Sequence, residues 1–221
     1  TVLKQYTHVA LDKNFWIFLL AGVTCYTIIV SYNVMTPFLI QDSLGFSAKD
    51  YGLLSIVIGI PFWIGAFLNA RYVKRLGSLF FIIIGFTVSI LSGVGMLLAT
   101  WLQPSFDIYT LMIPLAFASF AQAMLWSNII ANALKNFHKF AGIASALFSC
   151  LQLALASLVT AGIAYLPDHT PVPLGCVLIV VGVLVGVLTA LGYWSTLLKL
   201  IETHDGFQYI KHMKSSASSD A

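Results

Sequence analysis

The sequence predicts an all-α membrane protein with six transmembrane helices. Of its 221 residues, 59% are hydrophobic and only 9% are charged, whereas a soluble domain needs far more charge to cover its surface. Every charged side chain lies outside six apolar runs, each of about 20 residues or more, the length that spans a bilayer. Long continuous runs favour helices and exclude a strand barrel. The six runs are residues 14–40, 51–70, 79–101, 108–134, 140–166 and 174–198.

Lys and Arg are unevenly distributed between these spans, and the imbalance predicts the orientation. Ten of the eleven fall on one side of the membrane, and only Lys49 falls on the other. Because cytoplasmic loops carry the excess of Lys and Arg, both termini are expected in the cytoplasm. Residues 1–13 then form a cytoplasmic linker, 14–198 a transmembrane bundle and 199–221 a cytoplasmic tail. The scattered cations report topology, so no nucleic-acid partner is expected.

Polar residues divide the six spans into two similar triplets. The first, second, fourth and fifth spans carry polar residues at helical spacing, whereas the third and sixth are apolar nearly all round. A three-helix unit that is repeated once enters the membrane from opposite sides. The pattern therefore predicts two inverted three-helix repeats, with the apolar third helix of each repeat facing lipid.

The first two spans each contain a proline. Pro37 frees the carbonyl of Asn33 from its helical hydrogen bond, and Pro61 does the same for the carbonyl of Val57. Pro37 and Pro61 are therefore candidate hinges. The alternative is a proline that is simply tolerated because neighbouring helices satisfy the freed carbonyl.

The fourth and fifth spans carry side-chain amides. Gln122 shares a stripe of the fourth span with Ser119 and Trp126, and a second polar pair there is Asn128 and Asn132. The fifth span has a regular stripe, formed by Ser145, Ser149, Gln152, Ala156 and Thr160. Interhelical hydrogen bonds of about 1 kcal/mol explain most of these polar residues. Gln122 and Gln152 are favoured as groups that face a cavity.

The sixth span places three glycines on one face, Gly175, Gly182 and Gly186. Such a face lets another helix backbone approach closely. We expect it to pack inside the bundle rather than to form a dimer.

The spans contain no Asp, Glu, Lys, Arg or His. This absence removes the usual residues of a proton relay, an intramembrane protease or a metal site, so no catalytic residue, metal or cofactor is expected and an enzyme is improbable. An uncharged cavity with aromatic and amide walls suits amphipathic small molecules. The residues predicted to line it are Tyr26, Asn33, Phe62, Gln122, Trp126, Ser149 and Gln152.

Three runs of the sequence resemble one transporter family. Residues 131–159, ANALKNFHKFAGIASALFSCLQLALASLV, resemble the tenth-to-eleventh helix region of the major facilitator superfamily, in particular its Bcr/CflA-type drug:proton antiporters. The specific element is AGxASAL followed by LQ, although Ile143 stands where that group often has Thr. Residues 32–54 are similar to the family's seventh helix and the start of its eighth, and residues 65–77 to the basic loop that follows.

The resemblance implies the C-terminal six-helix half of a twelve-helix transporter that works by alternating access. Its partner is then an N-terminal half or a second copy of itself. The implied function is export of amphipathic small molecules, such as drugs in multidrug efflux, by proton antiport across a bacterial cytoplasmic (inner) membrane. Two alternatives stay open: an exporter of a specific metabolite such as a siderophore, and a six-helix scaffold or regulatory subunit that transports nothing.

The resemblance also bears on the charged groups. The family's proton-carrying acids usually belong to the N-terminal half, in agreement with the uncharged spans. Arg71, Lys74 and Arg75 follow the second span. They form either a cytoplasmic gate that bonds to the other half, as the resemblance suggests, or a topology anchor alone.

Overall fold

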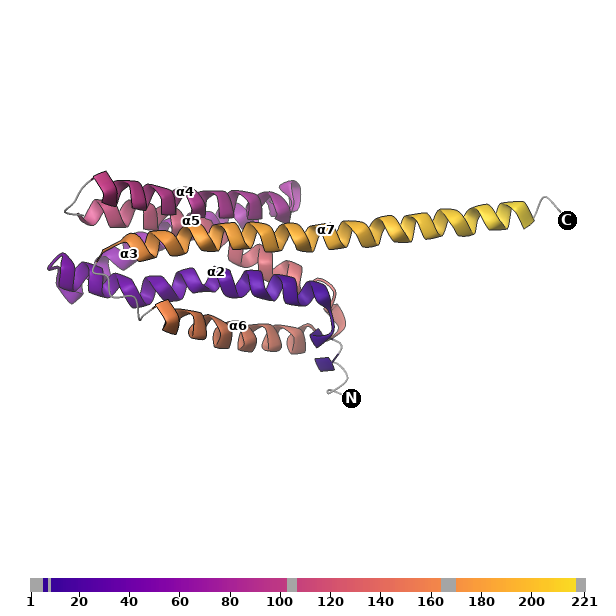
Figure 1. The fold of residues 1–221 in the computed structure, drawn as a ribbon, viewed down its shortest axis with the longest axis horizontal. Coiled ribbons are helices and arrows are strands. Elements are labelled where there is room, and N and C mark those ends of the chain that lie inside the picture. The colour runs from indigo at the N-terminus through magenta and orange to yellow at the C-terminus, as the bar shows by residue number, and fades with distance from the viewer. Residues whose placement is uncertain (1–5, 8, 103–106, 164–169, 218–221) are drawn as a thin grey trace.

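Six long helices run side by side (Figure 1). The computed structural model describes residues 6–7, 9–102, 107–163 and 170–217, and these residues form helices and no strand. Each of the six is long and apolar enough to cross a membrane, which confirms the predicted all-α membrane fold. They are α2 (Lys13–Phe38, continued by the π-helix η1, Leu39–Ser43), α3 (Ala48–Leu76), α4 (Ser78–Leu102), α5 (Ile108–Leu134), α6 (Ala141–Ile163, after the 3-10 helix η2, His138–Phe140) and α7 (Val172–Ala217).

Polar residues just outside the apolar runs set the helix boundaries. Asp12 caps α2 by accepting a 2.8 Å hydrogen bond from the backbone N–H of Phe15, and Ser47 and Asp50 form a reciprocal capping box at the start of α3. These caps satisfy N–H groups that have no partner within the helix. Gly77, with φ at +82°, is the single residue between α3 and α4. Glycine adopts this left-handed conformation without steric cost.

Helix α7 extends beyond the predicted sixth span. The apolar run ends at residue 198, but the helix continues to Ala217 and projects from the bundle at the end where α2 begins (Figure 1). No proline follows Pro173 to interrupt it. Much of the predicted tail, residues 199–221, is therefore helical.

The contacts between helices follow a two-fold pattern. Helix α2 packs against α5, α6 and α7, helix α5 packs against α2, α3 and α4, and α4 packs against α7. Exchanging α2 with α5, α3 with α6 and α4 with α7 reproduces the same set of contacts. The pattern agrees with two three-helix repeats whose members interlock, with α2 and α5 at the centre.

Helices α4 and α7, the apolar third helices, pack closely against each other. A Cβ atom at Gly93 would lie 2.7 Å from the carbonyl oxygen of Gly175, and one at Gly182 would lie 2.6 Å from Ile90. The Ser89 hydroxyl donates a 3.1 Å hydrogen bond to the carbonyl of Leu178. The glycine face of α7 thus packs inside the bundle, as expected. Small residues favour this helix contact, so one side of each third helix is buried in the bundle, and lipid contact stays a prediction for their exposed sides.

A network of amides joins four helices near the end of the bundle that carries Arg71, Lys74 and Arg75. The Asn128 amide of α5 donates to Asn69 Oδ1 of α3 at 2.6 Å. The Asn132 amide donates to the Ser78 hydroxyl of α4 at 2.7 Å, and Asn132 Oδ1 accepts a hydrogen bond from the Tyr193 hydroxyl of α7 at 3.4 Å. The second polar pair of the fourth span therefore holds helices together.

Replacing Asn128 with alanine is expected to lower the free energy of unfolding by about 0.6–1.7 kcal/mol, because the buried Asn69 carbonyl oxygen loses its amide donor. Ser127 is the matched control. It is exposed on the same helix, and its hydroxyl bonds only to the carbonyl of Ala123 one turn before. Denaturant unfolding in micelles measures both, and equal losses for Asn128→Ala and Ser127→Ala would contradict a role for the network.

Candidate functional site

Helices α2, α3 and α5 enclose a cavity of about 310 Å³. This volume lies at the lower end of the range of about 300–1,000 Å³ that is typical of small-molecule sites. Each helix contributes both apolar and polar side chains. The apolar residues that line it are Ile28, Ile29, Ile58, Phe62, Leu115 and Ala118, and the polar ones are Tyr32, Asn33, Ser55, Ser119 and Gln122. The lining holds no carboxylate, ammonium, guanidinium or imidazole group.

Hydrogen bonds of hydroxyl groups connect the helices that form the walls of the cavity. The Ser119 hydroxyl of α5 donates a 3.0 Å hydrogen bond to the carbonyl of Ile58 in α3. This carbonyl is adjacent to that of Val57, which Pro61 leaves without its helical donor. The Tyr32 hydroxyl of α2 and the Ser55 hydroxyl of α3 are 3.4 Å apart. Helix α3 remains one continuous helix through Pro61, and its use as a hinge stays a prediction.

The two predicted cavity amides both bond to the backbone of α2. The Gln122 amide donates to the carbonyl of Cys25 at 2.9 Å, and its oxygen lies 3.2 Å from the Cys25 sulfur. The Gln152 amide donates to the carbonyl of Gly22 at 2.8 Å. Their side chains are only 3% and 4% exposed, respectively. Gln122 holds α5 against α2 and also lines the cavity, whereas Gln152 holds α6 against α2 and is not among the lining residues.

Two of the predicted site residues form an aromatic pair. The rings of Tyr26 on α2 and Trp126 on α5 have centroids 5.3 Å apart and are tilted by 37°. Both side chains are half-buried. Trp126 follows Gln122 by one helical turn, but neither Tyr26 nor Trp126 is among the residues that line the cavity.

The structure brings together some of the predicted site residues and separates others. Asn33, Phe62 and Gln122 line one cavity, whereas Tyr26 and Trp126 contact each other and are not among its lining residues. Ser149 is exposed on α6 and does not line this cavity. The side chain of Thr160 lies outside the described part of the chain. The residues that sequence reasoning left out are Tyr32, Ser55 and Ser119, although Ser55 and Ser119 lay on the polar stripes of their spans.

Pro37 lies near the end of α2, six residues before the end of the π-helix η1. The wider turn is marked by hydrogen bonds from the backbone N–H groups of Leu44 and Phe46 to the carbonyls of Leu39 and Ile40, at 3.2 and 3.1 Å. π-turns are a usual feature of helix C-termini, so this turn by itself does not indicate a functional site. The hinge at Pro37 itself stays a prediction.

The three basic residues after the second span occupy the last turns of α3. Arg71, Lys74 and Arg75 are all exposed. Cations near a helix C-terminus interact favourably with the helix dipole, which suits an anchor and leaves the guanidinium and ammonium groups available to another chain. Among the described residues, no group of three or more His, Cys, Asp or Glu could hold a metal ion.

Comparison with known families gives one match. A family model described as Major Facilitator Superfamily matches residues 1–161. No curated protein matches the chain. The matched residues make up well over half of the sequence and contain α2, α3 and α5, which enclose the cavity, as well as α4 and nearly all of α6. With six membrane-spanning helices in two interlocked triplets, the chain belongs to the major facilitator superfamily.

Proposed function

We propose that the chain is half of a secondary active transporter that exports amphipathic small molecules in exchange for protons, as in multidrug efflux. The superfamily to which it belongs consists of transporters. The observation that carries the finer proposal is the uncharged cavity between α2, α3 and α5, with Phe62 and the amides Asn33 and Gln122 in its wall. Such a wall binds by burial, stacking and a few hydrogen bonds.

The partner in this proposal is a second six-helix bundle, because alternating access needs two bundles that rock about a central site. Helices α3 and α6 make the fewest contacts within the bundle and expose large apolar side chains. On α3, the rings of Trp63 and Phe67 stack on each other with centroids 5.8 Å apart while both remain more than half exposed. These faces support docking of an N-terminal half or of a second copy of the chain.

The mass of the polypeptide in its native membrane tests which partner is present. An antibody against residues 215–221 detects the chain after denaturing electrophoresis. A mass of about twice 24.1 kDa would support two halves in one polypeptide. A mass near that of this chain would support pairing with a second copy. If a chain of that single mass then gave no dimer on cross-linking, both partners would be contradicted.

The proposed coupling ion is the proton, and its carrier belongs to the partner bundle. The six apolar runs hold no ionisable Asp, Glu, Lys, Arg or His, and such groups are the usual proton relays in membranes. The proposed location is a bacterial inner membrane, with both termini in the cytoplasm because of the positive-inside rule.

Replacing Arg71, Lys74 and Arg75 together with glutamine is expected to reduce ethidium efflux by the intact transporter several-fold if the three form a gate to the partner bundle. The topology should persist, because other cations remain on the same side. The single change Lys49→Gln, in the opposite loop, is the control. Accessibility labelling checks topology. Normal efflux with normal topology would leave the three residues as anchors only.

A non-transporting scaffold is the competing function. Binding of an amphipathic cation such as tetraphenylphosphonium stabilises a protein that has a site for it by mass action. An upward shift in the unfolding temperature that saturates with this ligand supports the cavity. No shift at any soluble concentration, in a sample that unfolds cooperatively, would favour the scaffold.

A further inference from the structure

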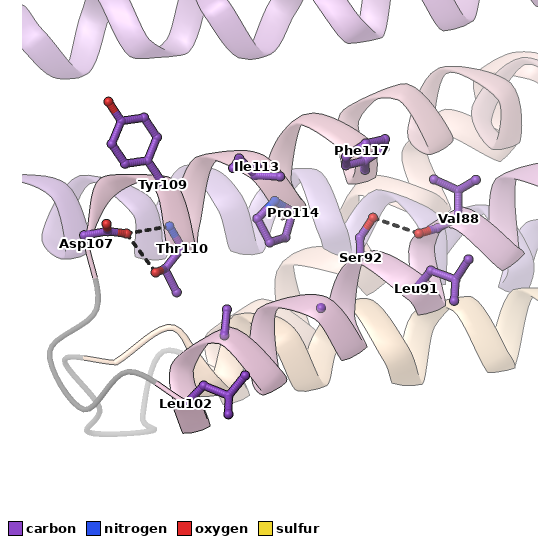
Figure 2. A pocket seen from close by; sticks show the side chains of 12 residues that line it. Val88, Leu91, Ser92, Leu102, Asp107, Tyr109, Thr110, Ile113, Pro114 and Phe117 are labelled. Atoms are coloured by element: carbon purple, nitrogen blue, oxygen red, sulfur yellow. Dashed lines mark hydrogen bonds between the residues drawn. The ribbon is translucent and has the colours of Figure 1, made fainter.

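The larger groove of the bundle is separate from the proposed substrate cavity. It lies between α4 and α5, encloses about 700 Å³ and shares no lining residue with the α2–α3–α5 cavity. Small residues of α4, Gly95 and Ala99, face large residues of α5, Tyr109, Ile113 and Phe117. Figure 2 shows Tyr109, Ile113 and Phe117 along α5, with Leu102 at the end of α4 and Asp107 at the start of α5.

The groove is long enough to extend through one bilayer leaflet. Its lining on α4 runs from Val88 to Leu102, which corresponds to about 21 Å of helix at about 1.5 Å per residue. One leaflet of a hydrocarbon core about 30 Å thick accounts for about 15 Å. Both walls belong to helices that are long and apolar enough to span a membrane, so in a bilayer the groove is open to the acyl chains of that leaflet.

The chemistry of the wall favours a hydrocarbon occupant over a polar solute. Three hydroxyl groups lie in it, and those of Ser92 and Thr110 donate hydrogen bonds within the protein, whereas that of Tyr109 belongs to an exposed side chain. The Ser92 hydroxyl donates to the carbonyl of Val88 at 2.7 Å, and the Thr110 hydroxyl donates to Asp107 Oδ1 at 2.8 Å (Figure 2). The remaining lining is mostly apolar. Away from the exposed Asp107 and Tyr109 at the start of α5, a polar solute would lose water without an equivalent partner, whereas an acyl chain loses nothing.

The mouth of the groove is negatively charged. Asp107 is the one charged side chain among the lining residues and is exposed at the start of α5. The backbone N–H and then the hydroxyl of Thr110 donate hydrogen bonds to its carboxylate and hold its pKa below the ordinary value. The carboxylate is therefore ionised at neutral pH. It attracts a cationic headgroup and repels an anionic one.

We propose that this groove binds one acyl chain of a phospholipid with an amine headgroup, such as phosphatidylethanolamine, whose ammonium group lies next to Asp107. The hydrocarbon wall selects the acyl chain, and the carboxylate at the mouth selects the headgroup. In the proposed orientation this lipid belongs to the outer leaflet.

Native mass spectrometry of the purified full chain tests the proposal. The chain is supplied in mild detergent with equal amounts of palmitoyl-oleoyl phosphatidylethanolamine and palmitoyl-oleoyl phosphatidylglycerol. Gly95→Phe fills the groove, and because a Cβ at Gly95 meets no atom within 4 Å the new ring clashes with nothing at its base. Gly52→Phe on α3 is the matched control, since Gly52 also has open space and lies outside the groove.

A second pair of variants separates headgroup from acyl chain. Asp107→Asn removes the charge and keeps the helix cap, because asparagine caps as well as aspartate. Asp12→Asn does the same at the start of α2, at the other end of the bundle. We expect the phosphatidylethanolamine adduct to dominate in the original chain. Its abundance should fall several-fold in Gly95→Phe but not in Gly52→Phe. The preference of the chain for phosphatidylethanolamine over phosphatidylglycerol should be lost in Asp107→Asn but not in Asp12→Asn.

Retention of the adduct by Gly95→Phe at the level of Gly52→Phe would overturn the groove as the site, and an unchanged headgroup preference in Asp107→Asn would overturn the role of Asp107.

Photo-labelling of the unmodified sequence tests the same site without any substitution, and it still applies if Gly95→Phe does not fold. Phosphatidylethanolamine with a photoactivatable acyl chain should label peptides from residues 88–102 or 107–117. Labelling confined to other helices would contradict the proposal.

Discussion

Replacing Gly93 with leucine is expected to disrupt the packing of α4 against α7 and to lower the unfolding temperature more than any other change considered for this chain. A Cβ at Gly93 would lie 2.7 Å from the carbonyl oxygen of Gly175 and 3.0 Å from the backbone nitrogen of Ile179. Backbone atoms cannot move aside as a flexible side chain can, so the two helices must separate. Overpacking of this kind costs about 1–3 kcal/mol, occasionally more.

Gly95, two residues further along the same helix, provides the control for Gly93. A Cβ there meets no atom within 4 Å, so Gly95→Leu is expected to leave stability unchanged or slightly raised, because leucine favours a helix over glycine. Thermal unfolding in detergent, followed by size-exclusion chromatography, measures both variants. Similar unfolding temperatures for Gly93→Leu and Gly95→Leu would show that α4 and α7 do not pack as described.

Replacing Gln122 with leucine is expected to weaken binding of an amphipathic cation to the intact transporter by about five- to tenfold. This corresponds to about 1–1.4 kcal/mol, the value of one hydrogen bond. Gln122 lines the cavity and also bonds to the carbonyl of Cys25. Gln152→Leu serves as the comparison, since its amide bonds to Gly22 and does not line the cavity. It should lower stability by about 1 kcal/mol and leave binding unchanged.

Fluorescence polarisation of rhodamine 6G measures binding by both glutamine variants, and denaturant unfolding measures their stability. Equal losses of binding in Gln122→Leu and Gln152→Leu would place both amides in the substrate site. Unchanged binding in both would reduce the pair to interhelical contacts.

The six spans could be predicted from the sequence because membrane insertion depends on length and hydropathy, which are local properties. The predicted starts lie within three residues of the helix starts in every span, since Asp12, Ser47 and Asp107 are capping residues just outside the apolar runs. The repeat was also visible, because polar residues mark α2, α3 and α5, which enclose the cavity, and α6, which packs against α2 as α3 packs against α5.

The assignment of faces was less successful. On α6, the polar stripe grouped Ser149 with Gln152, but the buried face runs through Ala144, Phe148, Gln152 and Ala156 and leaves Ser149 exposed. Which of two neighbouring faces of a helix is buried depends on the helix opposite, here α2, whose Phe15 ring packs edge-on against Phe148. The π-turn after Pro37 likewise had no local signal, because it depends on hydrogen bonds made after the helix is in place.

Proton-driven movement of an amphipathic cation tests the central claim most directly. The native polypeptide, extracted from its own membrane and reconstituted into liposomes with an acidic interior, should accumulate ethidium until nigericin collapses the pH gradient. Phe62→Ala, in the cavity wall, should reduce the rate several-fold, whereas Phe80→Ala, on the exposed side of α4, should not. No gradient-dependent accumulation, or equal rates for Phe62→Ala and Phe80→Ala, would contradict a transporter that binds its substrate between α2, α3 and α5.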